Sequence, residues 1–226
     1  MLRVVRISAW TMIWSGTIIL GYVAFQLFGT DLVNEQVQTE ARAELPSILE
    51  ERAQAVQSTT TTTTTVETTE PEPEPPPELL VEPPVDEGEA FAAIRIPSIG
   101  VENVVYEGVD RETLRLGPGH IPWTALPGQP GNAVLSGHRT TYGRPFFDLD
   151  QIQPGDQIEV ETAIGVSVYT VRESIVVLPT DVWVTEPKEG SWLTLTTCNP
   201  KFSARERLVV FAELTAGPNL DYVRAA

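Results

Sequence analysis

Residues 192–214, WLTLTTCNPKFSARERLVVFAEL, contain the pattern that decides the fold. Two apolar runs with β-strand character, 192–198 and 207–214, are separated by Asn199-Pro200 and a short polar loop. A strand that returns after so short a loop pairs antiparallel with the strand before it. We therefore expect a β-hairpin here, with Arg207 projecting near Cys198.

The chain's one cysteine lies at the end of the first of these strands. Side chains alternate between the two faces of a strand, so Leu193 and Leu195 share one face. Cys198 shares the other face with Thr194 and Thr196. A structural cysteine is expected on the leucine face, so this position indicates a functional thiol. A bulge would break the alternation, and an incidental cysteine stays open from this pattern alone.

The sequence from residue 91 onward is typical of an all-β domain. Short β-type runs alternate with turns rich in Gly, Pro and Asp, such as Pro154-Gly155-Asp156. The other expected strands are 92–96, 101–106, 133–136, 157–162 and 166–177. Short helical turns fit near 110–116 and 146–152. Many short strands with regular turns predict a closed barrel or a sandwich, and the 136 residues from 91 to 226 suffice for one core.

The composition excludes several classes of protein. The 226 residues include 31 acidic and 15 basic side chains, and a net charge of −16 argues against nucleic-acid binding. A single cysteine excludes an internal disulfide framework and a Cys-rich zinc module. Two histidines exclude a metal site made of histidine alone. We expect no metal and no cofactor.

Residues 1–30 predict a cytoplasmic stub followed by a transmembrane anchor. No residue from 7 to 28 is charged, and 22 residues at about 1.5 Å each span about 30 Å, the thickness of a bilayer core. Arg3 and Arg6 precede this run, so the positive-inside rule places the rest of the chain outside the cell. A cleaved signal peptide is the alternative, although its apolar core is normally about 7–15 residues long.

Residues 31–90 are expected to separate this anchor from the folded domain, 91–226. Apolar residues recur at every fourth position from Val33 to Leu49, which predicts a solvated helical stalk that Pro46 interrupts or kinks. From 58 to 89, a run of threonines and Glu-Pro repeats predict a disordered, extended linker. Residues 30–90 carry 15 acidic side chains against two arginines, so most of the net charge lies here.

An arginine near Cys198 would favour the reactive thiolate form of its side chain. A thiol with a reference pKa of about 8.5 is mostly protonated at neutral pH, and a nearby cation favours the thiolate. The fixed fork of donors of an arginine also suits a developing oxyanion. Arg207 is the candidate, and Arg205, which shares its strand parity, is the fallback. An ordinary surface charge is the alternative interpretation.

His138, in Ser136-Gly137-His138-Arg139, follows an apolar run and lies in a turn that can expose a catalytic imidazole. Such a group donates a proton to a leaving amine and then accepts one from the incoming nucleophile. His120 is its competitor, and spacing alone does not separate the two. No Gly-x-Ser-x-Gly, P-loop or Gly-x-Gly-x-x-Gly motif supports a serine hydrolase or a nucleotide enzyme.

Together these motifs resemble the sortase family. Residues 194–198, Thr-Leu-Thr-Thr-Cys, with Arg207 nine positions later, are similar to the sortase active-site signature. Residues 117–122, 126–132 and 136–143 resemble the upstream half of the family pattern. The resemblance covers about 91–215 and is greatest to the class E sortases of Gram-positive actinobacteria. Ile121 stands where relatives commonly carry an aromatic residue.

The resemblance implies an eight-stranded sortase barrel with one or two short helices and a Cys–His–Arg transpeptidase. Cys198 would be the nucleophile, His138 the general acid and base, and Arg207 the cation that stabilises the oxyanion or orients the substrate. His120 would have a structural or substrate-orienting role. The expected substrate-binding residues are His120, Thr196 and Thr197.

The implied reaction cleaves a Leu-(Pro/Ala)-x-Thr-Gly-like sorting signal between Thr and Gly. The acyl group then passes to an amine of a cell-wall precursor, with water as a slow competitor. The expected partners are surface proteins bearing such signals, the peptidoglycan precursor and the membrane. No lid with an Asp-Pro-aromatic motif is evident in 58–90, which favours protein anchoring over pilin polymerisation. A pilin-polymerising sortase and a non-catalytic, surface-displayed β-domain are the alternatives.

Overall fold

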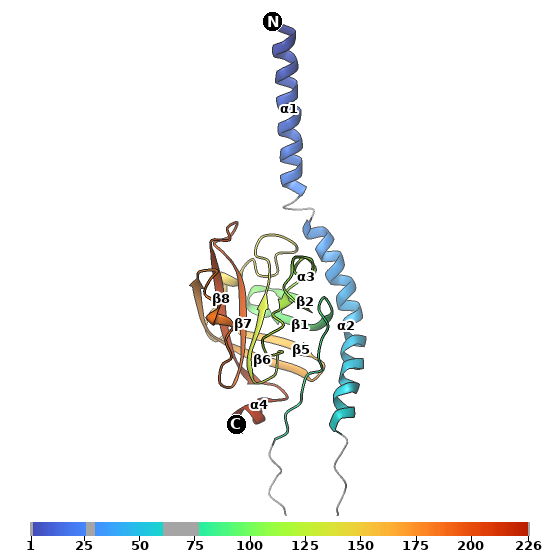
Figure 1. The fold of residues 1–226 in the computed structure, drawn as a ribbon, viewed down its shortest axis with the longest axis vertical. Helices are drawn as coiled ribbons and strands as arrows, with labels where there is room; N and C mark the ends of the chain where they lie inside the picture. The colour runs from blue at the N-terminus through green and yellow to red at the C-terminus, as the bar shows by residue number, and fades with distance from the viewer. Residues whose placement is uncertain (1, 26–29, 61–76, 226) are drawn as a thin grey trace, which may run out of the picture.

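The computed structural model describes residues 2–25, 30–60 and 77–225. Eight strands form a closed barrel in the order β1-β2-β3-β4-β7-β8-β6-β5 (Figure 1). The strands are β1 Ala90–Ile96, β2 Val101–Glu107, β3 Gly119–His120, β4 Gly131–Ser136, β5 Gln157–Thr162, β6 Gly165–Val177, β7 Ser191–Asn199 and β8 Glu206–Ala216. The expected closed eight-stranded barrel is confirmed. The two-residue strand β3 was not expected, because a pair of residues shows no periodicity.

Most neighbouring strands run antiparallel, but β3 pairs parallel with β2, and β4 pairs parallel with β7. The β4–β7 pair matters most for function. It brings Ser136, at the end of β4, opposite Thr196 near the end of β7. The loop that follows β4 therefore begins beside the end of β7.

The core lies inside the barrel and follows the alternation of the strands. Leu193 and Leu195 of β7 and Val210 and Ala212 of β8 are fully buried in one apolar cluster. The opposite face of these two strands carries a second, smaller cluster around Val209. The β7–β8 pair keeps one register from Trp192 to Asn199.

The remaining short elements are α3 Arg111–Leu116, α4 Leu220–Ala225 and the 3-10 turns η2 Pro97–Ile99, η3 Leu149–Gln151 and η4 Val182–Thr185. The helical turn expected at 110–116 is α3, and the side chain of Asp110 caps it by accepting from the backbone N–H groups of Glu112 and Thr113. The turn expected at 146–152 is only the 3-10 turn η3.

The expected solvated stalk is a helix that packs on the barrel. Helix α2, Thr30–Thr60, contains Pro46 and runs along β1 and β2 (Figure 1). Leu45 and Leu49 are buried against Val104 and Tyr106 of β2. The four-residue apolar spacing correctly predicted a helix. Its apolar stripe packs on the outside of the barrel rather than facing solvent, which corrects the expectation of a free stalk.

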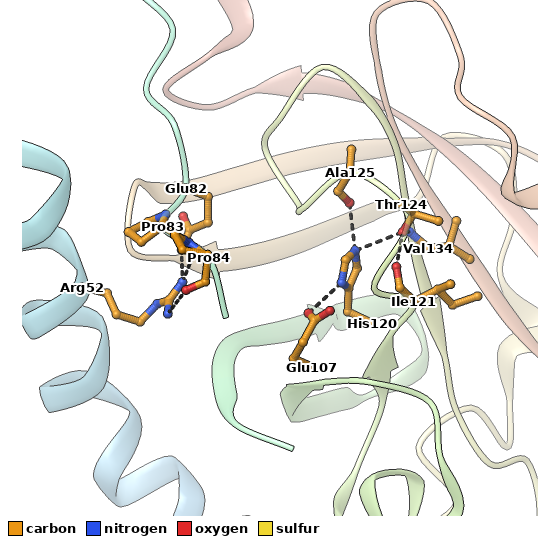
Figure 2. Close-up of polar contacts among 10 residues, drawn as sticks. All are labelled: Arg52, Glu82, Pro83, Pro84, Glu107, His120, Ile121, Thr124, Ala125 and Val134. Atoms are coloured by element: carbon orange, nitrogen blue, oxygen red, sulfur yellow. Dashed lines mark hydrogen bonds and ion pairs between the residues drawn. The ribbon is translucent and has the colours of Figure 1, made fainter. Parts of the chain in front are cut away.

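The end of the expected linker also belongs to the folded unit. Arg52 of α2 forms an ion pair with the buried Glu82 at 3.3 Å and donates to Pro83 O at 2.6 Å, as Figure 2 shows. The backbone N–H of Leu80 donates to Asn219 Oδ1 at 2.8 Å. Residues 77–89 are therefore not a free spacer. The rest of the Thr/Pro/Glu segment, 61–76, lies outside the described residues.

Helix α1, Leu2–Ala24, covers most of the expected membrane segment. Within the described residues, no helix combines the length and the apolarity that crossing a bilayer requires. The expected transmembrane helix over 7–28 is therefore not found among these residues, and its positions 26–28 lie outside them.

Candidate active site

Cys198 is a free, partly exposed thiol near the end of β7. Leu193 and Leu195 are buried in the core, as the alternation predicted, and Cys198 lies on the other face. The predicted strand parity is confirmed, since no bulge interrupts β7 between Trp192 and Asn199. The thiol is therefore accessible to a reactant outside the barrel.

Arg207 lies directly opposite Cys198 in the antiparallel β7–β8 pair. Side chains of opposed residues share one face of a sheet and lie close together. The guanidinium of Arg207 donates to the carbonyls of Ala204 at 3.1 Å and Glu206 at 2.9 Å. Arg205 precedes the strand and is exposed. The register thus favours Arg207 over Arg205 as the cation beside the thiol.

The residues on both sides of His138 are tied to β7. Gly137 N–H donates to Thr196 O at 3.1 Å, and the Thr197 hydroxyl donates to Gly137 O at 2.7 Å. After His138, the guanidinium of Arg139 donates to Cys198 O at 3.2 Å. His138 is thereby held between two anchor points on the strand that carries the thiol.

Arg139 is the functional residue that sequence reasoning missed. Its side chain is 3% exposed and pairs with Asp150 at 3.0 Å. It also donates to Asn199 Oδ1 at 2.6 Å. An arginine beside a candidate catalytic histidine was the available signal, but only the tertiary structure shows that its charge is buried behind the end of β7.

His138 is half-buried beside an aromatic and a cationic side chain. The centroids of the His138 and Tyr142 rings are 5.1 Å apart, and the guanidinium carbon of Arg115 lies 5.5 Å from the Tyr142 centroid. Burial, and secondly the positive charge of Arg115, lower the pKa of His138 below its ordinary value. The imidazole is therefore neutral at pH 7 and can accept a proton.

His120 is buried within the protein, with its ring nitrogens occupied (Figure 2). Its Nδ1 lies 2.7 Å from Glu107 Oε2, and its Nε2 donates to Ala125 O at 2.9 Å. Thr124 Oγ1 lies 3.0 Å from the same Nε2. At 1% exposure, His120 holds β2, β3 and the following turn together. These contacts support a structural role and leave His138 as the catalytic candidate.

The two threonines before Cys198 differ in their environment. Thr197 is 2% exposed, and its hydroxyl is committed to Gly137 O, so it holds the His138 loop rather than facing substrate. Thr196 is half-buried on the same face as Cys198. Of the three residues expected to bind substrate, the structure leaves only Thr196 accessible, because His120 and Thr197 point into the protein.

An apolar strip extends from Cys198 along the outer face of the hairpin. Val209 lies opposite Thr196 and Phe211 opposite Thr194, both buried beneath η4. The ring of Trp183 in η4 stacks on Phe211 with centroids 6.2 Å apart and stays 47% exposed. Val209 and Phe211 are covered by η4, so Trp183 is the exposed apolar side chain on this face of the hairpin. Within the described residues, no group of three metal-ligating side chains converges.

Residues 94–215 match the sortase domain family. Sortase SrtE1 of Streptomyces coelicolor is 34% identical over 145 residues, which are 57% of this chain and 41% of that protein. Sortase D of Bacillus subtilis is 30% identical over 190 residues, 84% of this chain and 86% of that protein. The chain thus spans less than half of the first relative and most of the second.

Two solved structures have a similar fold. A sortase D5 transpeptidase of Clostridium perfringens superposes with a TM-score of 0.62 at 25% identity, covering 80% of this chain and 99% of that one. Sortase E of Streptomyces avermitilis superposes with a TM-score of 0.54 at 37% identity, covering 58% of this chain and 91% of that one.

Proposed function

Because this chain belongs to the sortase family of cysteine transpeptidases and is similar to its class E members, we propose that Cys198, His138 and Arg207 carry out acyl transfer. The observation that carries the proposal is the placement of Arg207 opposite Cys198, with both neighbours of His138 bonded to β7. A nucleophile, a base and an oxyanion donor then lie around one strand end, as covalent catalysis requires.

The first half-reaction forms a thioester. The neutral imidazole of His138 accepts the thiol proton, and the sulfur of Cys198 attacks the carbonyl carbon of a Thr–Gly bond. Arg207 stabilises the negative oxygen of the tetrahedral intermediate. When the C–N bond breaks, the imidazolium of His138 gives its proton to the departing glycine amine.

The second half-reaction releases the acyl group. An acceptor amine attacks the thioester carbon and loses a proton to His138. The C–S bond then breaks, and the imidazolium of His138 returns a proton to the departing thiolate of Cys198. Water in place of the amine gives hydrolysis, which we propose as a slower side reaction. The imidazole of His138 serves both steps, because each step moves a proton to or from nitrogen or sulfur.

We propose that the acyl donor is a Leu-(Pro/Ala)-x-Thr-Gly-like sorting signal of a surface protein and the acceptor a cell-wall precursor amine. The match to the sortase domain family and the similarity to class E relatives support this substrate class. Both substrates lie outside the cytoplasm, so we place the domain at the cell surface.

The full chain incubated with a sorting-signal peptide library and primary amines tests this function. Mass spectrometry should show cleavage after Thr and transfer to the amine. A protein that yields no adduct and no product with any peptide would be a non-catalytic domain. Isopeptide-linked multimers of a pilin, without transfer to small amines, would instead indicate a polymerising enzyme.

A further inference from the structure

The first turns of helix α2 contact the loop that follows His138. One carboxylate oxygen of Asp31 accepts from Gly143 N–H at 3.1 Å, and the other pairs with Arg144 Nε at 2.9 Å. Asp31 is more than a hundred residues from this loop in sequence, and its side chain is 19% exposed. A single partly buried carboxylate thus holds two consecutive loop residues.

The loop has a backbone conformation that needs such support. Tyr142, Gly143 and Arg144 have φ values of 51°, 74° and 50°, so three consecutive residues are left-handed. Only glycine adopts this region readily, and the two other residues are held there by their surroundings. A Cβ on Gly143 would overlap Asn34 Oδ1, so the Asn34 side chain lies directly against the loop backbone.

Asn34 also holds the end of helix α3. Its side-chain amide donates to Arg115 O at 2.7 Å and to Leu116 O at 3.0 Å, and Gln38 Nε2 donates to Leu116 O at 2.7 Å. At 4% exposure, Asn34 is buried between the two elements. The start of α2 therefore fixes the end of α3 and the loop after His138 relative to each other.

These two elements carry the side chains that surround His138. Tyr142 comes from the loop and its ring is tilted against that of His138, while Arg115 comes from α3 and lies over the Tyr142 ring. Arg115 itself pairs with the exposed Glu112 at 2.8 Å. Arg139 pairs with Asp150, and Lys201 with Asp148 and Asp150. The start of α2 thus contacts Gly143, the neighbour of Tyr142, and the backbone carbonyl of Arg115.

We propose that helix α2 positions the catalytic histidine, with Asp31 and Asn34 as positioning residues that hold Tyr142 beside His138 and Arg115 over the Tyr142 ring. The expected effect of these contacts on turnover rests on the proposed function. Their effect on the surroundings of His138 does not depend on it. Loss of these contacts lets the loop relax, exposes His138 to water and moves Arg115 away. Both changes raise the pKa of His138 toward its ordinary value.

The helix has separate contacts that dock it on the barrel. Leu45 and Leu49 pack on β2, and Arg52 pairs with Glu82. Asp31 and Arg52 are 21 positions apart, about 30 Å along a helix. Arg52→Ala is therefore a matched control, because it removes a polar α2–barrel contact that is distant from the loop.

The experiment compares wild type with Asp31→Ala, Asp31→Asn, Asn34→Ala and Arg52→Ala in the full chain. The two histidines give two resonances, and a His138→Gln variant assigns them, so NMR titration measures the pKa of His138 without any substrate. We expect this pKa to rise in Asp31→Ala and Asn34→Ala and to stay unchanged in Arg52→Ala. Asp31→Asn keeps an oxygen that accepts from Gly143 N–H, so the pKa of His138 should rise less in this variant than in Asp31→Ala.

Steady-state kinetics with a sorting-signal peptide provide the second measurement. We expect kcat of Asp31→Ala to fall between about fivefold and 100-fold, with KM within twofold of wild type, because the catalytic base is misplaced rather than the substrate site lost. Circular dichroism monitors folding, and Asp31→Asn replaces Asp31→Ala if the latter does not fold.

Equal His138 titrations and equal kcat values in Asp31→Ala, Asn34→Ala and Arg52→Ala would overturn the proposal and leave α2 as a docking element only. If the pKa of His138 rises in Asp31→Ala and Asn34→Ala but the wild-type protein transfers no peptide, the positioning role stands and the proposed function is wrong. The two failures are therefore distinguishable.

Discussion

The buried guanidinium of Arg139 donates to the backbone carbonyl of Cys198 at 3.2 Å. Arg139 follows His138 directly in the chain, so this contact links the loop of the proposed base to the strand of the proposed nucleophile. Asp150, 3.0 Å away, compensates the charge of Arg139. The position of the His138 loop against the end of β7 thus depends on the side chain of Arg139.

Replacing Arg139 is expected to affect both stability and turnover. Arg139→Ala leaves Cys198 O and Asn199 Oδ1 without their donor, which should lower the free energy of unfolding by about 1–3 kcal/mol. We expect kcat to fall more than KM rises. Urea unfolding and steady-state kinetics measure these effects. The control is Arg172→Ala, whose ion pair with Glu213 is about half exposed and should contribute little.

Cys198→Ala should abolish cleavage and transfer and leave the fold intact. The thiol is partly exposed, so its loss should cost far less than the roughly 2–5 kcal/mol of a core Leu→Ala change. Intact-mass measurement of wild type with a sorting-signal peptide should show an acyl adduct that hydroxylamine removes. Transpeptidase activity in Cys198→Ala would contradict the nucleophile assignment.

Arg207→Ala should lower kcat by about 10²–10³-fold, the usual effect of removing an oxyanion donor. Arg205→Ala should have a much smaller effect, because Arg205 precedes β8 and is exposed. Both variants are compared under single-turnover conditions with the same peptide. A larger loss in Arg205→Ala would mean that the loop rearranges when substrate binds.

Arg115→Ala should raise the pKa of His138, since a neighbouring positive charge disfavours the imidazolium. The pKa of His138 should return only partly to its ordinary value, because burial is the larger cause of the shift and is unchanged in this variant. The low-pH limb of kcat/KM should shift to higher pH with it. NMR titration of His138, with His120 as the internal comparison, measures the shift. A fall in the pKa of His138 would show that Arg115 does not act through its charge.

Deleting α2 should destabilise the barrel. Removing residues 2–60 exposes Val104 and Tyr106, which Leu45 and Leu49 cover. Because burying one leucine contributes about 1.5–3 kcal/mol, the free energy of unfolding should fall by at least about 3 kcal/mol. Deleting only α1, whose described side chains are mostly exposed, should leave the unfolding midpoint unchanged. Equal midpoints for the two truncations would mean that α2 contributes nothing to the fold.

The strands and the position of Cys198 were predictable because their signals are local. Alternation placed Leu193 and Leu195 in the core and Cys198 outside it, and the short loop after Asn199 made the hairpin antiparallel with Arg207 near the thiol. These features depend on side-chain period and chain length, which are properties of adjacent residues.

The roles of the two histidines, of Thr197 and of helix α2 were decided by tertiary structure. His120 and His138 both follow glycines in turns, and only the barrel's closure buries the first against Glu107 and ties the neighbours of the second to β7. The apolar spacing of α2 predicted a helix but not its partner, because amphipathicity identifies a face to be buried without identifying the surface that covers it. Contacts such as Asp31 with Arg144 join residues more than a hundred positions apart, and no local pattern in the chain records them.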